Sequence, residues 1–186
     1  LRKIRTHPWL FGLGVMNSNG IFVLSVDRTG PKHVSADFSH REYFSYLSRR
    51  PYTERYCSGA FTESSTHDIW FACSRIMRVE GRKGFSGVVF AGLSAKHLKD
   101  FFEKPGFAEE GAIAVVDARG TLLFRNPAIP NTVGRKIDFP RLQEFMSDSA
   151  ASWYGDITSP LDGQNRIVAI HKVEEFPYAV LVSSTI

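Results

Sequence analysis

The chain has 186 residues, of which 43% are hydrophobic and 23% charged, as in folded globular proteins rather than disordered ones. That length allows one large domain or two small ones. The net charge of +4 comes from scattered Lys and Arg residues rather than one basic run, so no nucleic-acid partner is expected. No apolar run approaches the roughly 18 residues needed to cross a bilayer.

Both ends of the sequence look like interrupted elements. Residues 1–10, "LRKIRTHPWL", begin without Met and are typical of the end of a helix, and residues 179–186 are the end of an apolar strand. We therefore expect the chain to be an excised portion of a longer protein, with any membrane segment lying outside it.

The first half begins with a predicted hairpin, because Asn19-Gly20 between two apolar runs is a strong turn signal. A loop is expected over residues 29–39, and Ser39 suits the N-cap of a helix that continues to Pro51. Three strands and an amphipathic helix are then predicted at residues 55–62, 68–79, 84–94 and 95–104.

The second half repeats this order. Its hairpin, "VVDARGTLLF", stands 100 positions after "VMNSNGIFVL" and has the same layout. A helix with Pro140 in its first turn follows. Three predicted strands close the half, at residues 152–160, 164–173 and 176–184. The recurrence indicates a duplicated module and an α+β fold, with helices packed on a face of antiparallel sheet.

Several stretches resemble one protein family. "DFSHREYF" resembles that family's helix-opening pattern, and "IWFACSRI" resembles its Trp-containing strand. "FSGVVFAGLSAKHLKDFF" resembles the strand and helix that follow, while "AVVDARGTLLFRNP" and "VGRKI" resemble the start of a second module. In this order the stretches resemble the double-Cache (PDC) sensory domains of bacterial transmembrane receptors, each built from two tandem PAS-like modules.

The resemblance implies a periplasmic input domain of a receptor of the histidine kinase or diguanylate cyclase type, with no catalytic activity and no cofactor of its own. It implies a membrane-distal, ligand-binding module over residues 1–104 and a smaller membrane-proximal module over 105–186. A long N-terminal helix, mostly missing here, would precede them. The expected partners are a small molecule and a second copy bound through that helix, in a membrane-anchored parent chain.

Arg41 is the first candidate for ligand binding, since a guanidinium can hold a carboxylate through two parallel hydrogen bonds. An equally weighted alternative is that Arg41 pins the preceding loop through carbonyl groups or Asp37. Five further candidates lie on the same helix or on the Trp-containing strand: Tyr43, Tyr46, Trp70, Ser74 and Arg75. Trp70 and Ser74 share one strand face, whereas Arg75 faces the other way. For Trp70, core packing is the favoured interpretation.

The ligand class follows from a comparison within the family. Its amino-acid-binding members resemble one another in an Arg-x-Trp-Tyr segment and a later Asp that meets the ligand's ammonium group. Here the segment is Arg41-Glu42-Tyr43-Phe44, and Gly92 stands at the Asp position. Because a buried ammonium without its carboxylate partner is costly, an anionic ligand without an amine, such as a small carboxylate, fits better. An empty pocket is the alternative.

Cys57 and Cys73 lie in two strand-like runs on either side of a polar turn. If that turn is centred on Ser65, the two residues face each other and a disulfide becomes feasible. Two buried free thiols are the favoured interpretation, since a one-residue change of register removes the pairing.

The sequence leaves two function classes as alternatives to a sensor, an enzyme and a non-sensing module. The sequence contains no Gly-x-Ser-x-Gly, phosphate-binding loop, His-Glu-x-x-His or Cys-x-x-Cys pattern, which disfavours an enzyme. None of its six His has the helical spacing of metal ligands, so no metal is expected. A non-sensing dimerisation module or a cytosolic PAS pair is the main alternative to a sensor.

Overall fold

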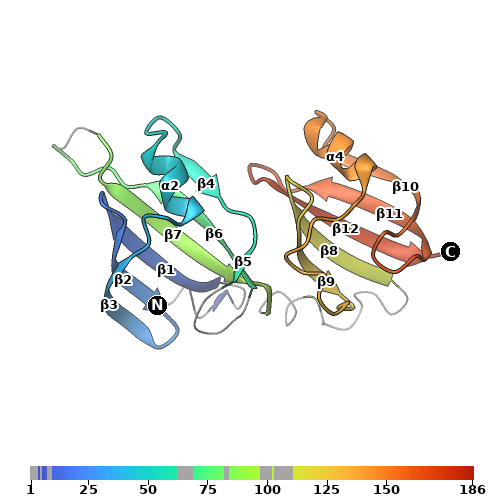
Figure 1. The fold of residues 1–186 in the computed structure, drawn as a ribbon, viewed down its shortest axis with the longest axis horizontal. Helices are drawn as coiled ribbons and strands as arrows, with labels where there is room; N and C mark the ends of the chain where they lie inside the picture. Colours follow the sequence, from blue (N-terminus) through green and yellow to red (C-terminus); the bar gives the residue numbers. More distant parts are fainter. Residues whose placement is uncertain are drawn as a thin grey trace. The chain divides into compact units, whose positions relative to one another are not determined.

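The chain folds into two compact units in a computed structural model that describes residues 4, 6–7, 10–62, 69–81, 84–96, 102 and 111–186. The first unit contains Leu1–Ser58 and Trp70–His97, and the second contains Gly59–Ile69 and Leu98–Ile186. Two antiparallel sheets dominate the fold, and a short helix lies over one face of each (Figure 1). The predicted α+β class is therefore confirmed.

The first sheet has the strand order β3-β2-β1-β7-β6-β4, with β5 paired to β6. Its elements are β1 (Leu10–Asn17), β2 (Ile21–Asp27), β3 (Gly30–Asp37), α2 (Glu42–Ser48), β4 (Arg55–Cys57), β5 (Phe61–Thr62), β6 (Ile69–Ile76) and β7 (Gly87–Ser94). The predicted strand over residues 55–62 is thus interrupted, while the other two predicted strands form where expected.

The second sheet has the order β10-β11-β12-β8-β9, which is the order β4-β6-β7-β1-β2 of the first sheet. Its elements are β8 (Gly111–Asp117), β9 (Leu122–Asn126), α4 (Pro140–Ser147), β10 (Ser152–Thr158), β11 (Asn165–Lys172) and β12 (Tyr178–Thr185). The helix and the last three strands lie within the predicted segments or within one residue of them, and β8 and β9 extend the predicted hairpin at both ends.

The two hairpins that the sequence repeats also share their turn chemistry. Asn17 Oδ1 accepts hydrogen bonds from the N–H groups of residues 19 and 21, both at 3.0 Å. Asp117 Oδ1 accepts the corresponding bonds from residues 119 and 121, at 2.9 and 2.8 Å. Gly20 and Gly120 both have a positive φ, +81° and +79°, which glycine adopts without steric cost. The matching residues therefore build the same local structure twice.

The loop predicted over residues 29–39 is wrong, because most of it forms the edge strand β3. Asp27 turns the chain by accepting bonds from the Thr29 N–H and hydroxyl, at 2.8 and 2.6 Å. Lys32 Nζ, 2.7 Å from Asp27 Oδ2, closes the same turn and is the main reason why the pKa of Asp27 lies well below its usual range. Pro31 resembled a loop residue, but an edge strand tolerates it since one side needs no ladder bonds.

Helix α2 begins later than predicted. Arg41, rather than Ser39, is its N-cap residue, with extended backbone angles and a carbonyl that accepts bonds from the N–H groups of Phe44 and Ser45. Tyr43, Phe44 and Leu47 form its buried face, spaced as on a helix that covers a sheet. The helix ends at Ser48, before Pro51.

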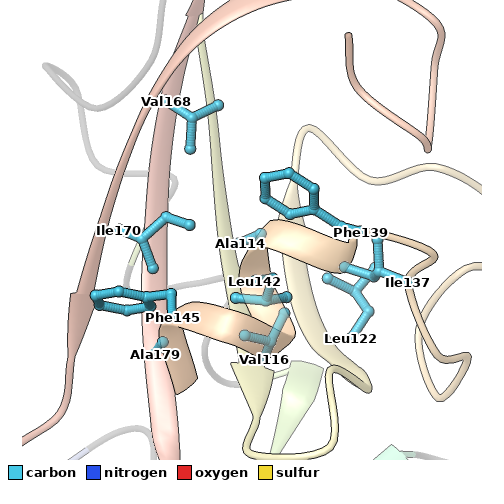
Figure 2. Close-up of a cluster of buried hydrophobic side chains, with 10 residues drawn as sticks. All are labelled: Ala114, Val116, Leu122, Ile137, Phe139, Leu142, Phe145, Val168, Ile170 and Ala179. Atoms are coloured by element: carbon cyan, nitrogen blue, oxygen red, sulfur yellow. The ribbon is translucent and has the colours of Figure 1, made fainter. Parts of the chain in front are cut away.

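The core of the second unit lies between α4 and its sheet. Pro140 occupies the first turn of α4, as predicted. Figure 2 shows Leu142 and Phe145 of this helix among side chains from the strands. Leu142 is fully buried. Burial of a side chain of this size contributes roughly 1.5–3 kcal/mol to folding.

Two predicted helices fall mainly outside the described residues, namely the N-terminal helix and the helix over residues 95–104. Of the latter, Ala95, Lys96 and Phe102 are described, and the Phe102 ring stacks on Phe124 with 5.2 Å between centroids. Over the part of the chain that the structure describes, no helix has the length and apolar character needed to cross a membrane.

Candidate functional site

The helix-bearing face of the first sheet gathers most of the predicted ligand-binding residues. Strands β6 and β7 pair Trp70 with Ser94 and Ser74 with Phe90, so these four side chains point to one side of the sheet. Ser74 Oγ lies 2.6 Å from the carbonyl oxygen of Tyr43 in α2, which shows that this is the side the helix covers.

Arg41 lies at the edge of an aromatic cluster on this face. Its guanidinium carbon is 5.8 Å from the centre of the Phe38 ring, within the range of a cation–π contact. Phe38 packs edge-on against Phe22 at 5.7 Å, and Phe22 is 5.3 Å from Phe90. Phe90 is in turn 4.9 Å from Tyr43. The structure therefore brings together the positive charge of Arg41 and the ring of Tyr43 around one apolar cluster.

The buried position of Tyr43 changes the pKa of its hydroxyl group. The residue is 6% exposed. Burial raises the pKa of Tyr43 from 10.0 to about 12, although the positive charge of Arg41 acts in the opposite direction. Tyr43 is therefore a neutral hydrogen-bonding group throughout the physiological pH range.

Ser74 and Tyr46 hold the helix in place. Besides its contact with the Tyr43 carbonyl, Ser74 Oγ is 3.2 Å from the carbonyl oxygen of Tyr56, so it links α2, β4 and β6. Tyr46 stacks on Tyr56 with 4.0 Å between ring centres, and the Arg50 guanidinium lies 4.3 Å above the Tyr46 ring. These contacts give Ser74 and Tyr46 a positioning role.

Trp70 lies above Gly92, the position at which the family comparison expects an Asp in amino-acid binders. Atoms of the Trp70 ring lie 3.2 Å from the place where a Cβ atom of Gly92 would stand, and Phe11 meets Trp70 edge-on at 4.0 Å. Trp70 is only 8% exposed. Its indole N–H and the hydroxyl of Ser94 are both buried and have no hydrogen-bond partner among the described residues.

Ser94 is a site residue that the sequence analysis missed. It ends the apolar strand "GVVFAGLS", two residues after Gly92 and therefore on the same face. The signal available in the sequence was a serine at the end of an otherwise apolar strand, and the structure shows that this serine is fully buried.

Arg75 is not brought to this face. It alternates with Ser74 along β6, and its side chain is 74% exposed, 3.5 Å from Glu54. Together with Glu54, Ile76 and Arg78 it lines a separate surface pocket. Arg75 therefore has the solvated environment of an ordinary surface ion pair.

Cys57 and Cys73 form a disulfide, so the favoured interpretation of two free thiols is wrong. The two residues are direct cross-strand partners on β4 and β6, and their sulfur atoms are 2.00 Å apart. The register that places them opposite each other is the one obtained by centring the turn on Ser65. Among the described residues, no group of three or more His, Cys, Asp or Glu side chains could hold a metal ion.

Comparisons with known proteins bear on both units. Residues 95–183 match the family described as dCache_1-like, histidine kinase sensor domain. Across the whole chain, the fold is similar to that of the extracellular domain of the predicted histidine kinase rpHK1S-Z16. The identity is 22% and the TM-score 0.78, over 100% of this chain and 74% of that one. A comparison with curated protein sequences found no match.

Two chemoreceptor ligand-binding domains have a similar fold. That of CtaA from Pseudomonas fluorescens, in complex with L-leucine, has 17% identity and a TM-score of 0.62 over 95% of this chain and 71% of that one. That of the amino acid chemoreceptor PctC from Pseudomonas aeruginosa PAO1, in complex with GABA, has 15% identity and a TM-score of 0.60 over 94% and 74%. At these identities the likeness shows a shared fold.

Proposed function

We propose, from the confirmed resemblance to dCache_1-like histidine kinase sensor domains, that this chain is the extracytoplasmic ligand-sensing region of a bacterial signal-transduction receptor. In this proposal residues 1–104 form a membrane-distal PAS-like module that binds the ligand, and residues 105–186 form a membrane-proximal one. The cytoplasmic output of the parent protein is of the histidine kinase or diguanylate cyclase type.

The disulfide supports a location outside the cytoplasm. Disulfides form and persist in oxidising compartments such as the bacterial periplasm, and they are rare where thioredoxin and glutathione keep thiols reduced. The bond between Cys57 and Cys73 therefore fits a periplasmic domain better than the alternative of a cytosolic PAS pair.

The observation that carries the ligand site is the pair of buried polar groups at Trp70 Nε1 and Ser94 Oγ. A buried donor without an acceptor costs about 1–3 kcal/mol, so such groups in a folded protein call for a partner. They lie on the face that also carries the Arg41 guanidinium. A small molecule with hydrogen-bonding oxygen atoms would supply partners for Trp70 Nε1 and Ser94 Oγ, and a carboxylate would in addition be attracted to the positive charge of Arg41.

A small carboxylate without an amine is the proposed ligand class. The chemoreceptor domains with a similar fold are in complex with L-leucine and GABA, both of which carry an ammonium group. Here the ring of Trp70 occupies the surface above Gly92, and glycine offers no carboxylate at that position. The sheet therefore lacks the negative charge that this position would give to an ammonium group.

Signalling would follow from a difference in affinity between two arrangements of the distal module. Ser74 ties α2 to β4 and β6, and Tyr43 ties it to β7, so a ligand held between Arg41 and the sheet would favour one position of the helix. A ligand shifts such an equilibrium only by its differential affinity for the two states.

The test is a thermal-shift and calorimetric screen of the purified chain against small carboxylates, amino acids, amines and sugars. Arg41→Gln is the test variant and Arg75→Gln the matched control, because Arg75 is exposed on the opposite side of the same sheet. A ligand at about 100 times its Kd should stabilise the native state by roughly 2.7 kcal/mol. We expect a carboxylate to bind, Arg41→Gln to abolish binding and Arg75→Gln to preserve it.

Two results would contradict the proposal. Unchanged carboxylate binding by a correctly folded Arg41→Gln variant would exclude this site. An amino acid as the tightest ligand would overturn the inference from Gly92, while leaving the sensory function intact.

A further inference from the structure

A pocket of about 50 Å³ lies in the second unit, on the helix-bearing face of its sheet. The apolar wall of this pocket includes Ala114, Val168 and Leu181. Two of these residues, Ala114 and Val168, also belong to the buried cluster shown in Figure 2. Arg125 and Arg166 are part of the same lining. An apolar pocket with a few convergent polar groups is the usual form of a small-molecule site.

The strands place both arginines at this pocket. Arg125 of β9 is the cross-strand partner of Ala114, and Arg166 lies two residues before Val168, on the same face of β11 by the two-residue period of a strand. Their side chains are only 6% and 12% exposed. One buried and one partly buried guanidinium group therefore border one small apolar space.

The carboxylate of Asp162 binds both Arg125 and Arg166. Asp162 Oδ2 accepts bonds from Arg125 Nη2 at 2.7 Å and from Arg166 Nη2 at 2.9 Å. Burial opposes ionisation of Asp162, but hydrogen bonds from Ser159 and Arg166 lower its pKa on balance. With Asp162 ionised, the cluster keeps one net positive charge.

The bonding of Arg166 is also incomplete. Its Nη2 faces Asp162, whereas Nη1 is buried and has no hydrogen-bond partner among the described residues. Arg125, by contrast, directs Nη1 to the carbonyl oxygen of Pro127. The unmet donor belongs to Arg166, and the unbalanced charge belongs to the two arginines that share Asp162. An anion bound at Arg166 Nη1 would satisfy both.

The size and lining of the pocket narrow the class of anion. A cavity needs a volume of roughly 10–15 Å³ to hold one water molecule. At about 50 Å³, this pocket has room for a few heavy atoms. Inorganic oxyanions are polar on all sides and would lose hydration against Ala114, Val168 and Leu181. A short aliphatic carboxylate has one charged end and one apolar end, as the pocket does.

We propose that the second unit binds a short-chain monocarboxylate of the size of acetate or propionate, with its carboxylate on Arg166 and its alkyl end against Ala114 and Leu181. This is a second site, made of residues separate from the Arg41 face of the first unit. The chain would then hold two anion sites, one in each unit.

Isothermal titration of the purified chain with acetate, propionate, hexanoate and sulfate tests the proposal, in a chloride buffer free of other carboxylates. NMR shifts of the Ala112 and Ser183 amides locate the binding, because these residues line the pocket. We expect acetate or propionate to bind, and hexanoate and sulfate to bind at least about tenfold more weakly. Arg166→Gln should weaken binding about ten- to a hundredfold, as for loss of a charge-assisted bond.

Three controls separate this site from other causes. Arg135→Gln, an exposed arginine of the same unit, should bind as the unaltered chain does. Arg41→Gln should also retain binding, so failure of the first site does not imply failure of this one. Ala112→Val narrows the pocket without touching the charged cluster, and should weaken binding even if Arg166→Gln proves unstable.

The proposal is overturned if neither acetate nor propionate shifts the pocket amides, or if sulfate binds more tightly than both. It is also overturned if a folded Arg166→Gln variant binds them with unchanged affinity. In those cases the cluster is a structural link between β9, β11 and the turn that carries Asp162.

Discussion

The two sheets of this chain share a strand order and a hairpin, yet their helix-bearing faces differ at equivalent positions. In the first sheet Gly14 lies opposite Phe90; in the second, Ala114 lies opposite Leu181. Phenylalanine rings fill the space above Gly14, whereas Ala114 borders an open pocket. The backbone thus determines where a site can lie, and the side chains at these positions determine whether that site is filled or open.

The two helix-bearing faces also differ at a second pair of equivalent positions, near the ends of the strands. Trp70 pairs with Ser94 on the first sheet, and Arg166 pairs with Thr185 at the matching position of the second. Each residue leaves one buried nitrogen atom without a partner in the described part of the chain. A neutral indole N–H favours a neutral or charged acceptor, whereas a guanidinium N–H favours an anion. The same backbone arrangement therefore presents two different hydrogen-bond donors to a ligand.

The largest expected effect concerns a feature that only the first sheet has. The disulfide joins the cross-strand pair Cys57 and Cys73, and the matching pair of the second sheet is Tyr154 and Ala169. Replacing both cysteines by serine should destabilise the first unit by about 2–4 kcal/mol, since the bond closes a short loop in the unfolded chain. Chemical denaturation followed by circular dichroism measures the loss.

Tyr154→Ser is the control for this change, because Tyr154 is 82% exposed and its loss should change stability by less than about 0.5 kcal/mol. A similar loss in both variants would mean that strand packing, rather than the cross-link, sets the stability of this edge.

The next largest loss of stability is expected from a valine at Gly14, compared with a valine at Ala114, the equivalent position of the second sheet. An added Cβ on Gly14 would lie 2.5 Å from the rings of Phe22 and Phe90, so Gly14→Val should cost about 1–3 kcal/mol through overpacking. Ala114→Val points into the second unit's pocket and should cost less. Urea denaturation of the two variants compares them directly, and equal losses would show that the two faces are equally tightly packed.

The smallest effect at neutral pH comes from Tyr43, because the pH dependence that it adds to the first unit appears only at alkaline pH. Its pKa is about 12 when folded and about 10 when unfolded, so the unfolded state loses the proton first. The contribution is complete below pH 10 and is lost as the pH rises toward 12, by up to about 1.4 kcal/mol per pH unit. Tyr43→Phe should remove this slope from urea denaturation curves, whereas Tyr52→Phe, at a 95% exposed position, should not. If Tyr43→Phe keeps the slope, another group titrates.

Much of the fold was predictable because its signals are local. The turn glycines Gly20 and Gly120, and the alternating apolar residues beside them, specify the hairpins without reference to distant parts of the chain. Strand β3 was missed because an edge strand pairs on one side only, so its sequence can be as polar as a loop and can include Pro31.

The candidate site was less predictable, because its properties depend on contacts between distant segments. The sequence indicated Arg41, Tyr43 and Trp70 by residue type, but it could not show that Ser74 is occupied by the carbonyl groups of Tyr43 and Tyr56. Nor could it decide the disulfide, which depends on a register that one residue would change. The sequence shows Arg166 only as one charge in an alternating strand, and its place in a cluster follows from the position of Asp162.

The edge strands of the first sheet affect how readily neighbouring copies of the protein can aggregate at high concentration. An open edge offers unpaired N–H and C=O groups to any neighbouring strand and so invites aggregation. Strand β3 closes one edge with Pro31, which has no N–H group, and with the charged Lys32, while the opposite edge strand β4 spans only three residues. These two edges therefore disfavour pairing between the first sheets of neighbouring copies.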